Sequence, residues 1–270
     1  MKTSLIRKGI LASAVAATLG LGFAPQAMAV PGVFEVSPNN LGLTGYSPFN
    51  ANQMLGNSSV LLTALDATHE TGSGWINFTS FTLNNTPILA GASGINLGGA
   101  NSYALYITFD QAATLTTGTI NTPGSSGVLT SLNYTLWADV GSDSVFTAAQ
   151  ASTATAATVA QNTADKILAT GSLLSGVNGI NALGGAFFNS VTTISLTADG
   201  SSYFTKPIPF FELAFEQFNN TSQGLEIVGN LVSINQETGS VDFNRIPEPA
   251  SLALMGLGLL GLSATRRRNK

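Results

Sequence analysis

Residues 103–109 read Tyr-Ala-Leu-Tyr-Ile-Thr-Phe, and a large apolar side chain occupies every second position from Tyr103 to Phe109. Alternation with a period of two is typical of a β-strand that buries one face. Residues 132–137 and 211–216 repeat this alternation. The sequence therefore predicts a body built from amphipathic strands.

Further strands are predicted on both sides of this stretch, at residues 60–65, 75–83, 167–174, 191–198 and 225–234. Glycine and asparagine recur between the predicted strands, where reversals of the chain require positive φ angles. Short strands separated by such turns are typical of all-β proteins. We expect an antiparallel β-sandwich of the jelly-roll type.

The predicted sandwich occupies residues 30–244, a length that suffices for one sizeable core. Residues 147–164 depart from the strand pattern because they consist almost entirely of alanine, threonine, serine and glutamine. Such low complexity indicates a surface insertion, either a short helix or a mobile loop. We expect a signal helix before the sandwich, in residues 1–29, and a transmembrane sorting helix after it, within residues 245–270.

The composition excludes several kinds of chemistry. The 270-residue chain has no cysteine and one histidine, so a cysteine-ligated metal, a cysteine nucleophile and a site with two imidazoles are impossible. His69 begins a sequence that resembles a zincin motif, but Ser73 stands where the second histidine is required. We expect His69 to flank a turn, and we expect neither a cofactor nor enzymatic activity.

Charge is distributed unevenly along the chain. Only three basic residues lie between Val30 and Ile246, against thirteen acidic residues, so this region has a net charge of −10. An acidic body disfavours nucleic acid, because phosphates require lysine and arginine partners. The other seven basic residues lie near the two ends of the sequence.

The first thirty residues have the pattern of a secretory signal peptide. Three basic residues precede an apolar stretch, and Ala27-Met28-Ala29 supplies the small residues that signal peptidase requires. We predict cleavage between Ala29 and Val30.

Residues 245–270 combine three elements. Pro247, Glu248 and Pro249 precede an apolar run at residues 250–264, and a basic cluster follows. That cluster contains Arg266, Arg267 and Arg268. As a helix the run would span about 22 Å, less than the roughly 30 Å hydrocarbon core of a bilayer, and the arginines would stay in the cytoplasm.

This order of elements resembles the PEP-CTERM sorting tail of Gram-negative bacteria. The resemblance implies transient association with the inner membrane, removal of the tail by an exosortase, and export to the cell surface or extracellular matrix. Proline fixes φ and lacks an N–H, so the motif stays extended and accessible beside the membrane.

The body carries a second resemblance. Residues 187–197, 200–204 and 207–215 are similar to segments of the flocculation-associated PEP-CTERM family. This similarity implies that the protein promotes cell aggregation together with exopolysaccharide or other matrix components. Two alternatives remain open, namely an extracellular glycan- or calcium-binding module and a polysaccharide-acting hydrolase.

A few residues are candidates for these alternatives. Asp139 and Asp143 offer oxygen ligands for calcium, although their spacing lacks the EF-hand pattern. Glu212 and Glu216 lie about 13 Å apart on an ideal strand, beyond the separation of glycosidase carboxylates, so we expect both on the solvent face. Sugar binding would need exposed aromatic rings, for which the candidates are Trp75, Trp137, Tyr106 and Tyr203.

Overall fold

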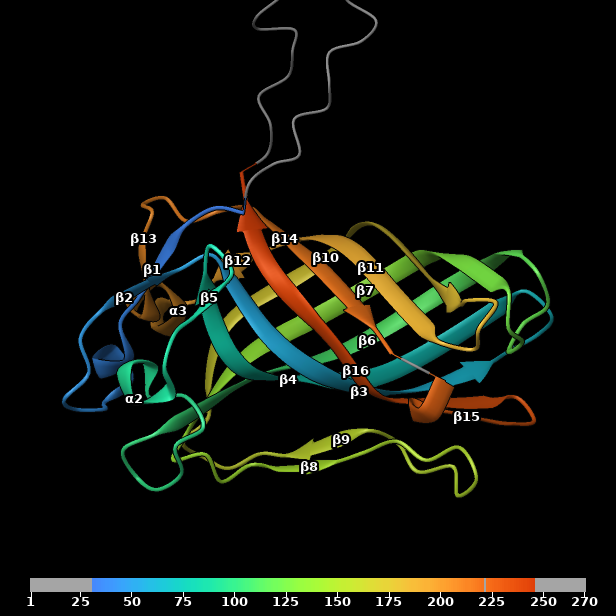
Figure 1. Ribbon diagram of the computed structural model, residues 1–270, viewed down its shortest axis with the longest axis horizontal. Helices are drawn as coiled ribbons and strands as arrows, with labels where there is room; N and C mark the ends of the chain where they lie inside the picture. Colours follow the sequence, from blue (N-terminus) through green and yellow to red (C-terminus); the bar gives the residue numbers. More distant parts are fainter. Residues whose placement is uncertain (1–30, 221, 246–270) are drawn as a thin grey trace, which may run out of the picture. The chain divides into compact units, whose positions relative to one another are not determined.

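The structure is a computed structural model that describes residues 31–220 and 222–245. These described residues belong to one compact unit. The described part is all-β, as the sequence predicts (Figure 1).

Eight long antiparallel strands form a closed barrel in the order β11-β14-β16-β3-β4-β6-β7-β10. Pairing of β10 with β11, in which Leu173 lies opposite Thr192, joins the two ends of this series. The strands are β3 (Gln53–Ala64), β4 (His69–Leu83), β6 (Tyr103–Thr117), β7 (Ser125–Val140), β10 (Lys166–Ile180), β11 (Ala186–Thr193), β14 (Leu213–Asn219) and β16 (Leu231–Asn244).

The closed barrel replaces the two-sheet sandwich that we expected. Alternation shows that a strand buries one face, but that face can pack against a second sheet or point into a barrel. Strand pairing decides between the two arrangements, and here every one of the eight strands has a neighbour on both sides. Closure leaves none of these eight strands at the edge of the sheet.

Two of the predicted strands also need correction. Residues 191–198 span the end of β11, β12 (Ser195–Leu196) and the first residue of α3 (Ala198–Tyr203). Residues 225–234 form the hairpin of β15 (Leu225–Val228) and β16, which reverses at Gly229, where φ is 60°.

Short elements gather at one end of the barrel (Figure 1). They include a three-stranded sheet of β13 (Phe204–Lys206), β1 (Phe34–Val36) and β2 (Phe49–Ala51). Nearby are η1 (Pro38–Leu41), α2 (Ala90–Ser93) and α3. The remaining short elements are β5 (Thr86–Pro87), which pairs with β4, and η2 (Ser222–Gly224).

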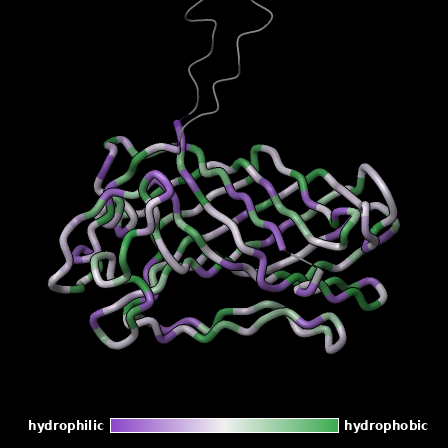
Figure 2. Tube along the Cα trace, in the orientation of Figure 1, coloured by the Kyte–Doolittle hydropathy of each residue, from purple (hydrophilic) through white to green (hydrophobic). Residues whose placement is uncertain are grey.

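Aromatic side chains fill this end of the barrel. Phe34 is fully buried and makes edge-to-face contacts with Phe204 and Phe243, with ring centroids 5.8 and 5.2 Å apart. The hydroxyls of Tyr103 and Tyr203 share a hydrogen bond of 2.8 Å. Edge-to-face pairs and a satisfied hydroxyl pair stabilise a dense core. Figure 2 shows apolar positions alternating with polar ones along the barrel strands.

Residues 147–164 contribute to a β-hairpin in place of the expected helix or loop. Strands β8 (Val145–Thr147) and β9 (Thr158–Ala160) pair with each other and lie against the outside of the barrel. The indole Nε1 of Trp75 donates to the carbonyl oxygen of Thr147 at 2.9 Å, and the amide of Ala149 donates to Ser59 Oγ at 2.8 Å. These bonds hold the segment against the barrel wall, and between β8 and β9 it forms a turn at residues 151–154.

No helix within residues 31–220 and 222–245 is long and apolar enough to cross a membrane. The predicted signal helix and sorting helix both fall outside the described residues.

Candidate functional site

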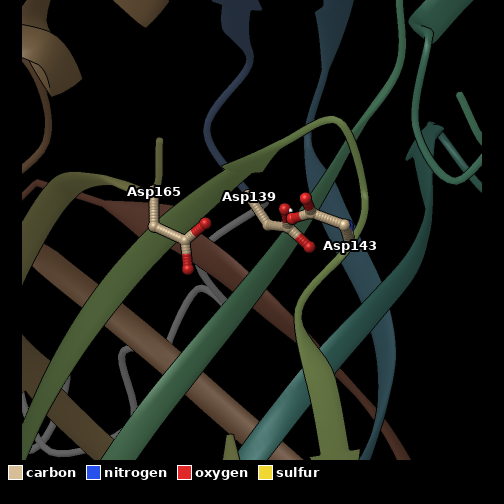
Figure 3. Close-up of side chains that lie close together, drawn as sticks. All are labelled: Asp139, Asp143 and Asp165. Carbon is tan, nitrogen blue, oxygen red and sulfur yellow. Dashed lines mark hydrogen bonds between the residues drawn. The ribbon is translucent and has the colours of Figure 1, made fainter. Parts of the chain in front are cut away.

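Three aspartates lie together on the outer wall of the barrel (Figure 3). Asp139 lies near the end of β7 and is 1% exposed. The chain then turns through Gly141 and Ser142, both with positive φ, so that the amides of Asp143 and Ser144 donate to the Asp139 carboxylate at 3.2 and 2.9 Å. This turn brings the Asp143 side chain back toward that of Asp139.

The third member, Asp165, was not predicted from the sequence. It directly precedes β10, and its Oδ2 accepts hydrogen bonds from the Tyr106 hydroxyl at 2.6 Å and from Ser144 Oγ at 3.0 Å. Its Oδ1 is buried and has no hydrogen-bond partner within the part of the chain that the structure describes. One carboxylate oxygen from each of Asp139, Asp143 and Asp165 lies within 4.8 Å of the other two.

The charge of this acidic cluster is not balanced by the closest basic residue in sequence. Lys166 follows Asp165 directly, but its Nζ lies 3.8 Å from the carboxylate of Asp199. The amide of Asn162 donates to Asp143. Converging carboxylate oxygens are the ligand type that calcium prefers. The prediction of Asp139 and Asp143 as calcium ligands is untested, and the structure adds Asp165 to this set.

A polar groove of ≈ 380 Å³ runs along the barrel wall beside β9. Trp75 of β4 lines the groove and packs edge-to-face on Phe146, and Asp110, Asn133 and Thr135 line it from β6 and β7. Residues 157–159 form the opposite border.

The four aromatic candidates for sugar binding separate into two groups. Tyr106 and Tyr203 are fully buried, so neither can stack on a sugar. Trp137 is partly buried and stacks on Tyr106, with ring centroids 6.1 Å apart and an interplanar angle of 9°. Of the four, only Trp75 lines the groove.

The expectation that Glu212 and Glu216 share the solvent face is wrong. Glu212 is exposed and precedes β14, whereas Glu216 lies within β14 and points into the barrel with 4% exposure. Ser190 Oγ and Thr192 Oγ1 both donate to the Glu216 carboxylate, yet burial raises its pKa to about 7.

A second buried carboxyl, that of Glu237, was not predicted from the sequence. It faces the interior because Gln236 adopts a φ of 59° and interrupts the register between Asn235 and Glu237. Ser58 Oγ donates to it at 2.6 Å, and burial raises its pKa to about 7. Strand alternation alone would have placed Glu237 outside.

His69 flanks a turn, as predicted. Its Nδ1 lies 2.9 Å from Asp66 Oδ2 on the exposed surface. The Thr68 amide and the His69 ring hold the pKa of the Asp66 carboxyl well below its usual range. This contact belongs to a turn and offers no open metal position.

Comparison with known proteins identifies one region of the chain. Residues 245–268 match the family model of the PEP-CTERM protein-sorting motif. The chain carries a PEP-CTERM sorting motif. No curated protein and no solved structure matches the chain.

The PEP-CTERM motif establishes how this protein is sorted. It marks the chain as an exosortase substrate, destined for export to the cell surface or the extracellular space. The predicted sorting residues Pro247, Glu248 and Pro249 lie within the match, as do Arg266, Arg267 and Arg268. All six lie outside the described residues, as do Ala27, Ala29 and Val30 of the predicted signal cleavage site.

Proposed function

We propose that this PEP-CTERM protein is a non-enzymatic matrix protein of a Gram-negative bacterium, and that it promotes cell aggregation by binding exopolysaccharide. The groove beside β9 supports this proposal most directly. It combines one indole with polar side chains on the outer wall of an exported protein. A sugar ring presents an apolar face to an aromatic ring, and its hydroxyls form hydrogen bonds with amide and carboxylate groups.

The positions of the acidic residues support a non-enzymatic role. Glu212 is exposed, whereas Glu216 is enclosed by the barrel, so these two carboxylates do not face a common substrate. Within the described groove the acidic lining residue is Asp110. Hydrolysis of a glycosidic bond by the common mechanisms requires two carboxyl groups about 5–9.5 Å apart across the bond.

Deletion of the gene, followed by complementation with groove variants, tests this proposal. Wild-type protein should restore flocculation, whereas an Asp110→Asn, Asn133→Ala double variant should restore it poorly although it is exported normally. Ser131→Ala provides the matched control, because Ser131 is exposed on β7 two residues before Asn133 and does not line the groove.

Different outcomes test the aggregation role and the groove as the binding site separately. Normal flocs in the deletion strain would exclude the aggregation role. Full complementation by the groove double variant would exclude the groove as the contact with polysaccharide. Release of new reducing ends from host exopolysaccharide by the purified protein would contradict the non-enzymatic assignment.

Calcium binding is a second candidate function, favoured by the buried and unpartnered Oδ1 of Asp165 beside two other carboxylates. Calcium titration by calorimetry should show binding to the wild-type chain and a loss of affinity in Asp165→Asn. The matched control is Asp199→Asn, which removes an acid outside the cluster. Equal heats of calcium binding for the wild-type chain and for Asp165→Asn would exclude this site.

A further inference from the structure

The barrel interior contains a cavity of ≈ 50 Å³ beside the aromatic core, and core residues such as Tyr134 and Phe218 form part of its wall. It extends along the interior toward Ile120 and Asn121, in the turn between β6 and β7, whereas Tyr103 at the other end of β6 belongs to the aromatic core. One water requires roughly 10–15 Å³ measured in this way. The cavity therefore has space for a molecule of several non-hydrogen atoms.

Most of the cavity wall is apolar. A cluster of buried side chains at this end comes from β3, β11 and β16, and Phe109 packs against it. The members of this cluster are Val60, Leu62, Ala186, Val232 and Ile234. Apolar contacts of this kind favour a hydrocarbon group over water.

The ionisable groups in the wall that carry a charge near neutral pH are all carboxyls. Glu70, Glu216 and Glu237 all line the cavity, and no lysine, arginine or histidine is among the described residues that do. The nearby donors already form hydrogen bonds with these carboxyls. Asn178 Nδ2 donates to Glu70 at 2.6 Å, and serine hydroxyls donate to the other two carboxyls.

Gln111 supplies an independent observation that points to a ligand with hydrogen-bond donors. Its side chain lines the cavity and is 7% exposed, yet its Oε1 accepts no hydrogen bond from residues 31–220 or 222–245. A buried acceptor without a donor costs about 1–3 kcal/mol, so native proteins seldom leave one unsatisfied. A molecule in the cavity that carries N–H or O–H groups would satisfy it.

The geometry points to the barrel interior as a binding site for a small primary alkylammonium ion, whose –NH₃⁺ group donates to the acidic and amide acceptors while its chain packs on the apolar wall. The ammonium group supplies three donors and the positive charge that the wall lacks. The short hydrocarbon chain fits both the volume and the apolar lining. This site is separate from the outer groove and does not depend on the proposed contact with polysaccharide.

Titration of the purified full-length chain with n-butylammonium chloride tests the inference. At pH 8, above the pKa of about 7 of Glu216 and Glu237, both carboxyls are largely ionised. We expect saturable binding at one site, about tenfold tighter than binding of n-butanol, because a hydrogen bond to a charged group exceeds a neutral one by roughly 1–1.5 kcal/mol. The Gln111 side-chain amide resonances should shift on binding.

Variants locate the bound ion. A Glu216→Gln, Glu237→Gln double variant keeps the side-chain shapes and should lose the preference for n-butylammonium over n-butanol. Glu212→Gln, which removes an exposed carboxyl just before β14, should retain that preference. Circular dichroism checks that each variant is folded.

Three results would overturn the inference. They are the absence of saturable n-butylammonium binding to the folded wild-type chain, equal affinity for n-butanol, and an unchanged preference in the folded double variant. The first would mean that the cavity holds only water.

Discussion

Replacement of Glu216 by glutamine should change how the stability of the protein depends on pH. Glu216 is buried in the barrel, where Ser190 and Thr192 donate to its carboxylate. Burial nevertheless dominates and raises its pKa from 4.5 to about 7. Glutamine keeps the shape of the side chain and an oxygen that accepts from Ser190, but it does not ionise.

The sign and size of the effect follow from this shift in pKa. Below pH 4.5 the carboxyl is protonated in both the folded and the unfolded chain, so it contributes no pH dependence. Between pH 4.5 and 7 the unfolded chain ionises while the folded chain stays protonated, and the free energy of unfolding falls as pH rises. Each pH unit costs about 1.4 kcal/mol, so Glu216 should lower stability by about 2–3 kcal/mol between pH 5 and pH 8.

Urea unfolding followed by tryptophan fluorescence at pH 5, 6, 7 and 8 measures this difference. From pH 5 to pH 8 the free energy of unfolding of the wild-type chain should fall by about 2–3 kcal/mol more than that of Glu216→Gln, with equal m-values. Glu212→Gln, four residues earlier and exposed, should follow the wild-type curve. If the free energy of unfolding falls equally steeply with pH in Glu216→Gln and in the wild-type chain, the assignment of a raised pKa to the buried Glu216 carboxyl is refuted.

Three further substitutions test the packing by urea unfolding. Gly171→Ala should cost about 1–3 kcal/mol, because the new Cβ would lie 2.1 Å from the carbonyl oxygen of Thr193; an unchanged midpoint would contradict this close approach. Tyr203→Phe should cost about 1–3 kcal/mol, since the Tyr103 hydroxyl would stay buried without its partner. Adding Tyr103→Phe should recover part of that loss, and strictly additive losses would argue against the hydroxyl pair. Phe243→Ala should cost about 3–5 kcal/mol through a cavity in the aromatic core, and a loss below 1 kcal/mol would exclude close packing there.

The strands were more predictable than their arrangement. Alternation at residues 103–109 depends only on neighbours in sequence, and these residues do lie in β6. Closure depends on the pairing of β10 with β11. This pairing is made by backbone hydrogen bonds, which the hydropathy of the side chains does not reveal. The same alternation is therefore compatible with a sandwich and with a barrel.

The orientation of individual acids was less predictable still. Phe215 and Glu216 are adjacent, and the hydrophobic pattern placed Phe215 inside, but Glu216 is the residue that faces the interior. Hydropathy missed this because Ser190 and Thr192 satisfy the carboxyl from the neighbouring strand. Asp165 was missed for another reason: hairpin β8–β9 separates it from Asp143 in sequence, and only the fold brings them together.

The burial of some acidic residues affects how much of the body's net charge of −10 acts between neighbouring molecules. Glu216 and Glu237 line the barrel interior, where burial raises the pKa of each to about 7, so near neutral pH these two groups carry less than their full charge. Under the proposed aggregation role, we expect assisting cations to act on outer acids such as Asp143 and Asp165. Chelation of divalent cations should therefore weaken flocs of cells with wild-type protein or Glu216→Gln, whereas flocs with Asp143→Asn, Asp165→Asn should be weak already and respond less. If that double variant forms normal flocs that remain fully sensitive to chelator, the cations act elsewhere on the cell surface.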